Sequence, residues 1–220
     1  MEKNIRKSVI AGSWYPGEPA VLTKDIKAYL KKVPGNGLSD RVVGLISPHA
    51  GYLYSGQIAA YGYRLIEGQR FDSVIVIGPS HRSLFRGASV YTSGGYETPL
   101  GIVPVDSGLA ERIVHNGGNI NYFPQAHQQE HSIEIQLPFL QVVLGSFSFV
   151  PIVMGDQDRG ACEELAGAIV KAAKGKKILV VGSSDLSHFH SYDRAVKLDS
   201  RVVDLVQKMD ADGLLRELEN

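Results

Sequence analysis

Short, predominantly apolar runs alternate along this chain with longer segments of helical character. The runs at 42–46, 73–77, 147–154 and 178–181 are rich in β-branched residues, as expected of strands buried on both faces. Helices are predicted at 21–32, 54–67, 106–115, 132–144, 159–174, 192–209 and 210–219. Because strands that alternate with helices indicate βαβ units, we predict one α/β domain over residues 1–220, with a largely parallel central sheet flanked by helices on both faces.

Two local features modify this pattern. Turn residues and alternating polarity between Ala88 and Val105 predict an antiparallel excursion, after which Asp106 is suited to cap the next helix. Pro138 lies inside the predicted helix at 132–144, so that helix either kinks or begins late.

Three histidines follow apolar runs at the points where buried strands should end. His49 follows the run at 42–46, His81 follows 73–77 and His188 follows 178–181. Ligands of open α/β sheets bind outside the carboxyl ends of the strands, so these loops should meet at one edge. Imidazole binds transition metals and titrates near neutrality, which predicts metal or acid–base chemistry there.

Asp185 precedes His188 by three residues, which would place both side chains on one side of a helical turn. A carboxylate beside an imidazole orients the ring and favours its protonated form, as in a general acid or base. Alternatively, Ser183, Ser184 and Asp185 act as helix caps. Both roles are compatible.

The segment from His127 to His131 reads H-x-x-E-H, the inverted zinc-peptidase pattern, with Glu130 as the acidic residue. On a helix, two histidines four apart share a face and can chelate zinc. Pro124 places His127 near a loop or a first turn, so we expect His127 to be exposed and His131 to lie in the cleft.

Composition restricts the range of partners and compartments. Lys plus Arg and Asp plus Glu both number 23, so no net charge drives binding to nucleic acid or to an anionic membrane surface. The single cysteine, Cys162, excludes an internal disulfide and fits a reducing compartment. With no signal-peptide core and no apolar stretch of about 18 residues, we expect a cytoplasmic protein whose ligand is a small molecule or a peptide.

Several segments, in order along the chain, together resemble the Memo family, the protein B component of the AmmeMemoRadiSam set. They are Ala11-Gly12-Ser13-Trp14-Tyr15-Pro16, Ser47-Pro48-His49-Ala50-Gly51-Tyr52, Gly78-Pro79-Ser80-His81, Glu97-Thr98-Pro99-Leu100-Gly101, Glu130-His131-Ser132-Ile133-Glu134 and Ser183-Ser184-Asp185-Leu186-Ser187-His188. The resemblance implies a fold like that of the LigB-type class III extradiol dioxygenases.

The resemblance also implies a site, built from His131, Asp185 and His188 as catalytic residues and from His49 and His81 as metal ligands. Iron(II) or copper would be the ion. In the family pattern a cysteine in a downstream Cys-Gly segment supplies a third candidate ligand. This chain ends at Asn220 and its Cys162 lies in a different segment, so we expect it to lack that part.

Three functional hypotheses follow. The first is a metal-capable cleft with dioxygenase-like redox chemistry, in which two imidazoles and a third ligand leave positions open for substrate or oxygen. The second is a non-catalytic module that binds a peptide or phosphopeptide in the same cleft. The third is a zinc hydrolase that uses His127, Glu130 and His131. The oligomeric state is left open.

Overall fold

The computed structural model describes residues 4–35 and 42–218, and it divides into two compact units, residues 1–184 and 185–220. The sequence predicts one domain over residues 1–220. The first helix after residue 184 is α7 (Tyr192–Gln207), and it has no buried side chain. This agrees with the division into two units.

The first unit is built on a six-stranded sheet with the order β2-β9-β3-β8-β4-β7. Its strands are β2 (Gly44–Ser47), β3 (Ser73–Pro79), β4 (Ala88–Val90), β7 (Ile120–Asn121), β8 (Phe149–Met154) and β9 (Ile178–Ser183). The four strands β2, β9, β3 and β8 run parallel, and β4 is antiparallel to β8. The predicted α/β class with a largely parallel sheet is therefore confirmed.

A second, three-stranded sheet accounts for the predicted antiparallel excursion. Strand β5 (Gly95–Thr98) forms a hairpin with β6 (Gly101–Pro104), and β1 (Ile5–Arg6) pairs in parallel with β5. Gly101, at the start of β6, has φ +113°, a value that favours glycine because it has no Cβ. The pairing of β1 with β5 joins residues 5–6 to residues 95–96.

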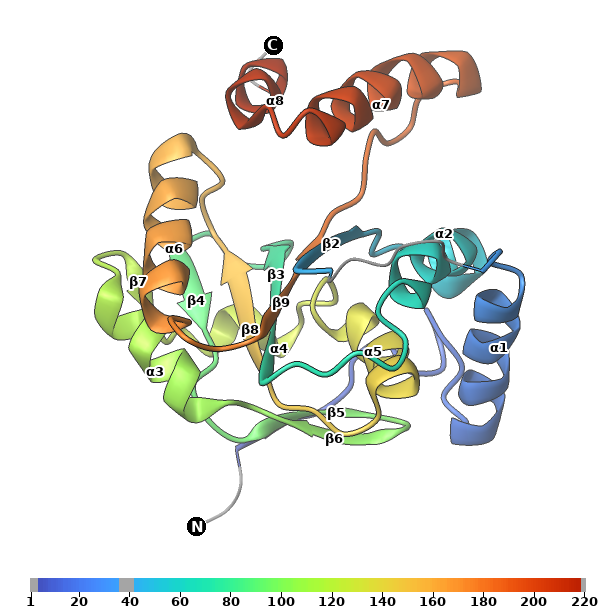
Figure 1. Ribbon diagram of the computed structural model, residues 1–220, viewed down its shortest axis with the longest axis horizontal. Coiled ribbons are helices and arrows are strands. Elements are labelled where there is room, and N and C mark those ends of the chain that lie inside the picture. Colours follow the sequence, from blue (N-terminus) through green and yellow to red (C-terminus); the bar gives the residue numbers. More distant parts are fainter. Residues whose placement is uncertain (1–3, 36–41, 219–220) are drawn as a thin grey trace. The chain divides into compact units, whose positions relative to one another are not determined.

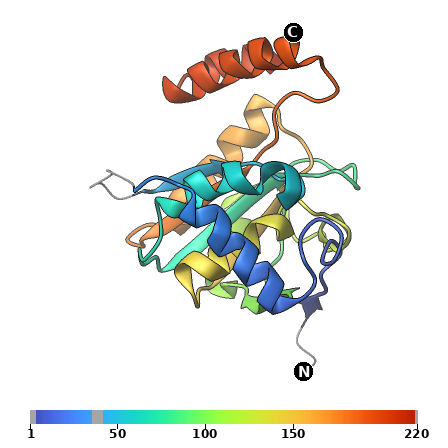
Figure 2. The same ribbon diagram turned by 90° about the vertical axis from the view of Figure 1, so that its right-hand side faces the viewer.

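Helices cover the large sheet on opposite sides (Figure 1). One group consists of α1 (Pro19–Lys31), α2 (Tyr52–Arg64) and α5 (Leu137–Leu144), which contact one another and lie toward the viewer in Figure 2. The other group is α3 (Ser107–Asn116) packed on α6 (Arg159–Ala172). Helices on both faces were predicted.

The predicted helix at 132–144 begins late, one of the two outcomes expected from its proline. A 3-10 turn, η1, covers Glu134–Gln136, and α5 starts at Leu137 with Pro138 in its first turn. Proline is tolerated there because the first N–H groups of a helix have no partner within it. Residues 131–133 therefore remain irregular, which leaves His131 in a loop.

The second unit contains α7 and α8 (Ala211–Leu218), which pack on each other. The Arg201 guanidinium of α7 pairs with the Glu217 carboxylate of α8 at 2.8 Å. The helix predicted at 210–219 is confirmed up to residue 218, and residue 219 lies outside the described residues. Among the helices that the structure describes, none has the length and apolar character needed to cross a membrane.

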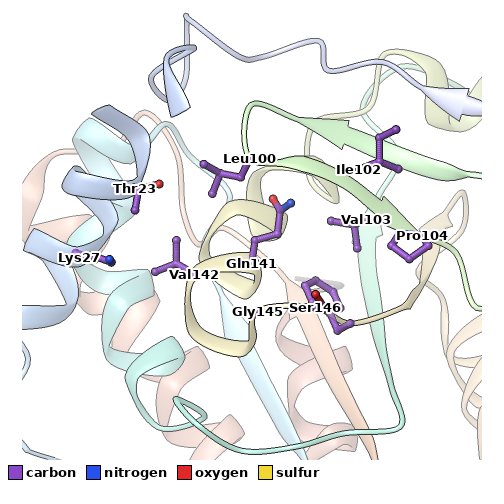
Figure 3. Close-up of a pocket in the computed structure, with 11 residues that line it drawn as sticks. Thr23, Lys27, Leu100, Ile102, Val103, Pro104, Gln141, Val142, Gly145 and Ser146 are labelled. Carbon is purple, nitrogen blue, oxygen red and sulfur yellow. The ribbon is translucent and has the colours of Figure 1, made fainter. Parts of the chain in front are cut away.

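A pocket of about 620 Å³ lies between α1, β6, α5 and the residues that precede β8 (Figure 3). Lys27, Gln141 and Ser146 supply polar groups to a lining that also contains Leu100 and Phe147. Since Phe147 comes just before β8, the pocket adjoins the edge where a parallel strand begins, away from the edge where the histidines were expected. None of the predicted site residues lines it.

The cap of α3 provides a test of the fold. The Asp106 carboxylate accepts a hydrogen bond from the Leu109 amide at 2.9 Å, as predicted. We expect Asp106→Ala to lower the free energy of unfolding by about 1 kcal/mol, the usual cost of losing an N-cap. Urea unfolding measures this, with Glu111→Ala on the exposed face of α3 as the control. Equal losses in both variants would contradict the capping role.

Candidate metal centre

Parallel pairing brings the ends of three strands together. His49 lies two residues after β2 and His81 two residues after β3, while β9 runs between these strands and ends at Ser183. Ser47 and Ser183 are register partners. The centroids of the His49 and His81 rings are 5.2 Å apart, so the prediction that these two histidines meet at one sheet edge is confirmed.

A third imidazole joins them from the loop between α4 (Gln125–Gln128) and η1. The ring of His131 lies 4.3 Å from that of His81 and 5.6 Å from that of His49, measured between centroids. One nitrogen from each of the three rings lies within 4.8 Å of the other two. This arrangement can hold one metal ion, and it makes His131 a candidate ligand as well as a cleft residue.

Hydrogen bonds fix the tautomer of His49. The Ser183 hydroxyl donates to the Ser132 carbonyl at 2.6 Å, so its lone pairs accept from its two other neighbours. These are the Gln136 amide nitrogen at 2.7 Å and the His49 Nδ1 at 3.1 Å. Nδ1 of His49 therefore carries the proton and Nε2 carries the lone pair. His49 is buried, with 5% of its surface exposed.

Glu130 orients His81 in a similar way. Its carboxylate accepts from the His81 Nδ1 at 2.8 Å and from the His81 backbone amide at 2.6 Å, and also from the amides of His131 and Ser132 at 2.9 Å each. Burial alone would raise the pKa of Glu130, but these donors lower it below its usual value. Glu130 is thus an anion, and Nδ1 of His81 carries the proton that it accepts.

His131 is held as a neutral ring. Burial, opposed by the Glu130 charge and reinforced by His81, His49 and Arg82, lowers the pKa of His131 to about 4. The indole of Trp14 packs against it, with centroids 4.4 Å apart. Trp14 thus covers one side of the His131 ring. It remains accessible itself, with 36% of its surface exposed.

His127 was expected to be exposed, and this expectation is wrong. The side chain is fully buried, and the hydroxyl of Ser89 lies 2.9 Å from Nε2 while that of Tyr96 lies 2.7 Å from Nδ1. Because Ser89 donates to the Phe123 carbonyl, it accepts from Nε2, and Tyr96 donates to Nδ1. Burial, together with Arg6, lowers the pKa of His127 to about 3.

The H-x-x-E-H segment therefore does not form a zinc-peptidase motif. Helix α4 ends at Gln128, so His127 and His131 do not share a helical face. His127 uses both ring nitrogens in the core, and the Glu130 carboxylate accepts four hydrogen bonds instead of facing a water molecule. Pro124 does begin the short helix, as the sequence indicated, but tertiary packing decides which way the side chain points.

Asp185 and His188 belong to the second unit. Residues 184–191 are irregular, so the predicted helical turn is absent, and Ser191, not one of residues 183–185, precedes α7. Even so, the two side chains approach, with His188 Nε2 3.7 Å from the Asp185 carboxylate. The His188 Nδ1 donates to the Leu186 carbonyl at 2.7 Å. That this pair joins the histidine cleft stays a prediction.

Sequence reasoning missed the residues that orient the cluster. The sequence suggested a helix cap for Ser183 and a hydrolytic base for Glu130, and the family segments that contain them indicated no orienting role for either. Gln136 was not singled out, although it lies only five residues after His131. Trp14 was named only as part of a segment that carries the family resemblance. Its place in the Gly-Ser-Trp-Tyr-Pro segment was the only available signal.

The lowered pKa values predict acid sensitivity. An unfolded histidine titrates near 6.5, so between pH 6.5 and about 4 the unfolded chain binds protons that His127 and His131 in the folded protein do not. Stability is therefore present above pH 6.5 and is lost as the pH falls, by about 1.4 kcal/mol per pH unit for each histidine. Urea unfolding of metal-free protein between pH 7 and 5 measures this slope.

His127→Gln should reduce that slope by about one proton, because glutamine does not titrate. His115→Gln is the matched control, since His115 is exposed at the end of α3. An unchanged slope in His127→Gln would mean that His127 does not have the lowered pKa.

Comparisons with known proteins agree with the motifs. The model of the Memo-like protein family matches residues 6–220. A MEMO1 family protein of Thermotoga sp. (strain RQ2) is 38% identical over 218 residues, which cover 93% of this chain and 78% of that protein. One from Methanobrevibacter smithii is 38% identical, covering 97% and 80%, and one from Thermoplasma volcanium is 34% identical, covering 98% and 79%. The chain therefore belongs to the Memo family.

Proposed function

We propose that this protein binds one iron(II) or copper ion at His49, His81 and His131 and uses it for dioxygenase-like redox chemistry. The ligand acted on is a small molecule or a peptide. The observation that carries the proposal is the convergence of three imidazoles, from two strand ends and one loop, with a nitrogen of each within 4.8 Å of the others.

The protonation of the rings supports metal binding. A histidine must be neutral to bind a metal, and His131 is neutral throughout the physiological range because its pKa is about 4. His49 and His81 each use Nδ1–H to bond Ser183 or Glu130, so Nε2 is the nitrogen that each ring would offer to a metal. A metal-bound histidine usually donates its other N–H in this way, often to a carboxylate.

The donor set narrows the choice of ion. Imidazole suits zinc, copper, iron and nickel, and three such ligands leave coordination positions open. A redox-active ion with open positions, when bound, can bind and activate oxygen or an oxidisable substrate.

In the described part of the chain, the group that can hold a metal contains no carboxylate. We therefore propose His131 as the third ligand.

The surrounding residues have separate tasks. Ser183 and Glu130 hold the rings of His49 and His81, while burial of His49 limits the access of water from the sheet side. Trp14 forms an exposed apolar wall beside His131, against which a bound ligand can pack.

The two other hypotheses have less support. A phosphopeptide site would benefit from cationic imidazoles, but the low pKa of His131 removes its positive charge at neutral pH. A zinc hydrolase needs Glu130 beside a water molecule, whereas its carboxylate is surrounded by protein N–H groups. We also propose a cytoplasmic location, supported by the single, half-buried cysteine.

The His49→Ala, His81→Ala double variant tests the proposal. We expect the purified wild-type protein to bind about one equivalent of iron(II) or copper and the double variant to bind none, with little loss of stability. Anaerobic titration with elemental analysis measures the metal. The fluorescence of Trp14, the only tryptophan, should be quenched as the site fills.

His115→Ala and His127→Ala are the controls, because neither side chain faces the cluster. Both should keep the metal. Unchanged metal content in the double variant would exclude this site. Consumption of oxygen by the iron-loaded protein in the presence of a candidate ligand, lost in the double variant, tests the redox part of the proposal.

Glu130→Gln separates the metal centre from a hydrolase. Glutamine cannot accept all four hydrogen bonds that the carboxylate accepts, so His81 should lose its orientation and metal affinity should fall roughly 10–100-fold. A zinc peptidase would instead keep its zinc and lose peptide cleavage. Metal dissociation constants and cleavage of a peptide library, measured on the same preparations, distinguish these outcomes.

A further inference from the structure

Arg6 is a buried cation outside the histidine cluster, with only 5% of its surface exposed. It ends β1 and directs its guanidinium toward the loop that precedes η1. Nε donates to the His127 carbonyl at 2.7 Å and Nη2 to the Glu130 carbonyl at 2.5 Å, while Nη1 pairs with Glu134. Its charged centre also lies 4.7 Å from the ring centroid of Tyr96.

The two carbonyls that Arg6 binds belong to the end of α4, at His127, and to the following loop that supplies the site, at Glu130. The Glu130 carbonyl is part of the peptide bond to His131, so its position fixes where the His131 backbone begins. The same residue carries the carboxylate that orients His81. A single guanidinium therefore holds the backbone from which both the third candidate ligand and the orienting carboxylate extend.

Glu134, the partner of Arg6, extends the same connection to Trp14. Its carboxylate is fully buried and accepts from the Ser8 hydroxyl at 2.6 Å and from the Tyr15 hydroxyl at 2.7 Å. The amide of Val9 adds a bond of 3.0 Å. These contacts fix the segment that carries Trp14, whose ring lies on His131.

We propose that Arg6 is a positioning residue of the metal centre, an inference that rests on the proposed function. A buried ion pair alone does not imply such a role, because neutral residues of similar volume often replace one without loss. Here, however, the planar fork of the guanidinium spans two backbone carbonyls and a carboxylate. A lysine ammonium keeps the charge but cannot reproduce this geometry.

The test compares Arg6→Lys with the wild type, using cobalt(II) as the probe because its visible absorption reports the geometry of its ligands. We expect Arg6→Lys to remain folded, to bind cobalt(II) roughly 10–100-fold more weakly and to show a shifted absorption band, as for the loss of an orienting partner. If Arg6→Lys does not fold, the double variant Arg6→Met, Glu134→Gln, which removes both charges together, replaces it.

Two controls distinguish positioning from general stability. Lys7→Met changes the neighbouring cation, whose exposed side chain pairs with Glu97 of β5. Leu22→Ala opens a cavity in the hydrophobic core beneath α1, where Leu22 is fully buried. Both should bind cobalt(II) like the wild type when the proteins are folded. Equal weakening in Leu22→Ala and Arg6→Lys, or an unchanged absorption band in Arg6→Lys, would overturn the inference.

A measurement without metal separates this inference from the proposed function. The Nδ1 proton of His81, bonded to Glu130, should give a downfield NMR signal in the metal-free wild type and in Leu22→Ala, and the signal should be lost in Arg6→Lys. If the wild type binds no cobalt(II), the metal proposal fails while this signal still tests Arg6. A wild-type signal in Arg6→Lys would show that Arg6 does not position the loop.

Discussion

Parallel pairing of β2, β9 and β3 is the constraint on which the site depends. The register that pairs Ser47 with Ser183 ends the three strands at about the same level of the sheet. His49 and His81, which follow two of these strands, therefore lie close together. Ser183, at the end of the middle strand, is then the natural bonding partner for His49. A shift of one residue would direct Ser183 to the opposite face, because successive side chains alternate across a strand.

Two buried carboxylates, Glu130 in the loop and Glu134 in η1, have different roles. Glu130 is surrounded by N–H groups, which keep it anionic and turn the imidazole of His81, while Glu134 is paired with Arg6 and joins the chain's beginning to η1. Each is costly to bury alone and is stabilised by several donors. Their negative charges do not make His131 cationic, because desolvation and the neighbouring rings outweigh Glu130. The segment from α4 to η1 therefore combines two buried carboxylates with the neutral imidazoles of His127 and His131.

Much of this arrangement could be predicted from local sequence. Apolar runs located the strands, Asp106 located the start of α3, and the position of His49 and His81 after two strands placed them at one edge. These predictions succeed because strand ends and caps depend on neighbouring residues. The bond between Arg6 and Glu134 joins residues 128 positions apart, and no local pattern indicates which buried carboxylate pairs with which cation. The late start of α5 followed from Pro138, yet the sequence could not decide between a late start and a kink.

The H-x-x-E-H segment explains why spacing alone was insufficient. Four-residue spacing implies a shared face only if the helix continues through all five residues, and α4 ends after Gln128. Once the helix ends, the two histidines are free to differ: His127 turns into the core between Ser89 and Tyr96, and His131 turns toward the strand ends. The Glu130 carboxylate, between them, accepts from the amides of His131 and Ser132 after the break and from the amide of His81 beyond β3. The acidic residue that would activate water in a peptidase thus stabilises the loop geometry that prevents the peptidase arrangement.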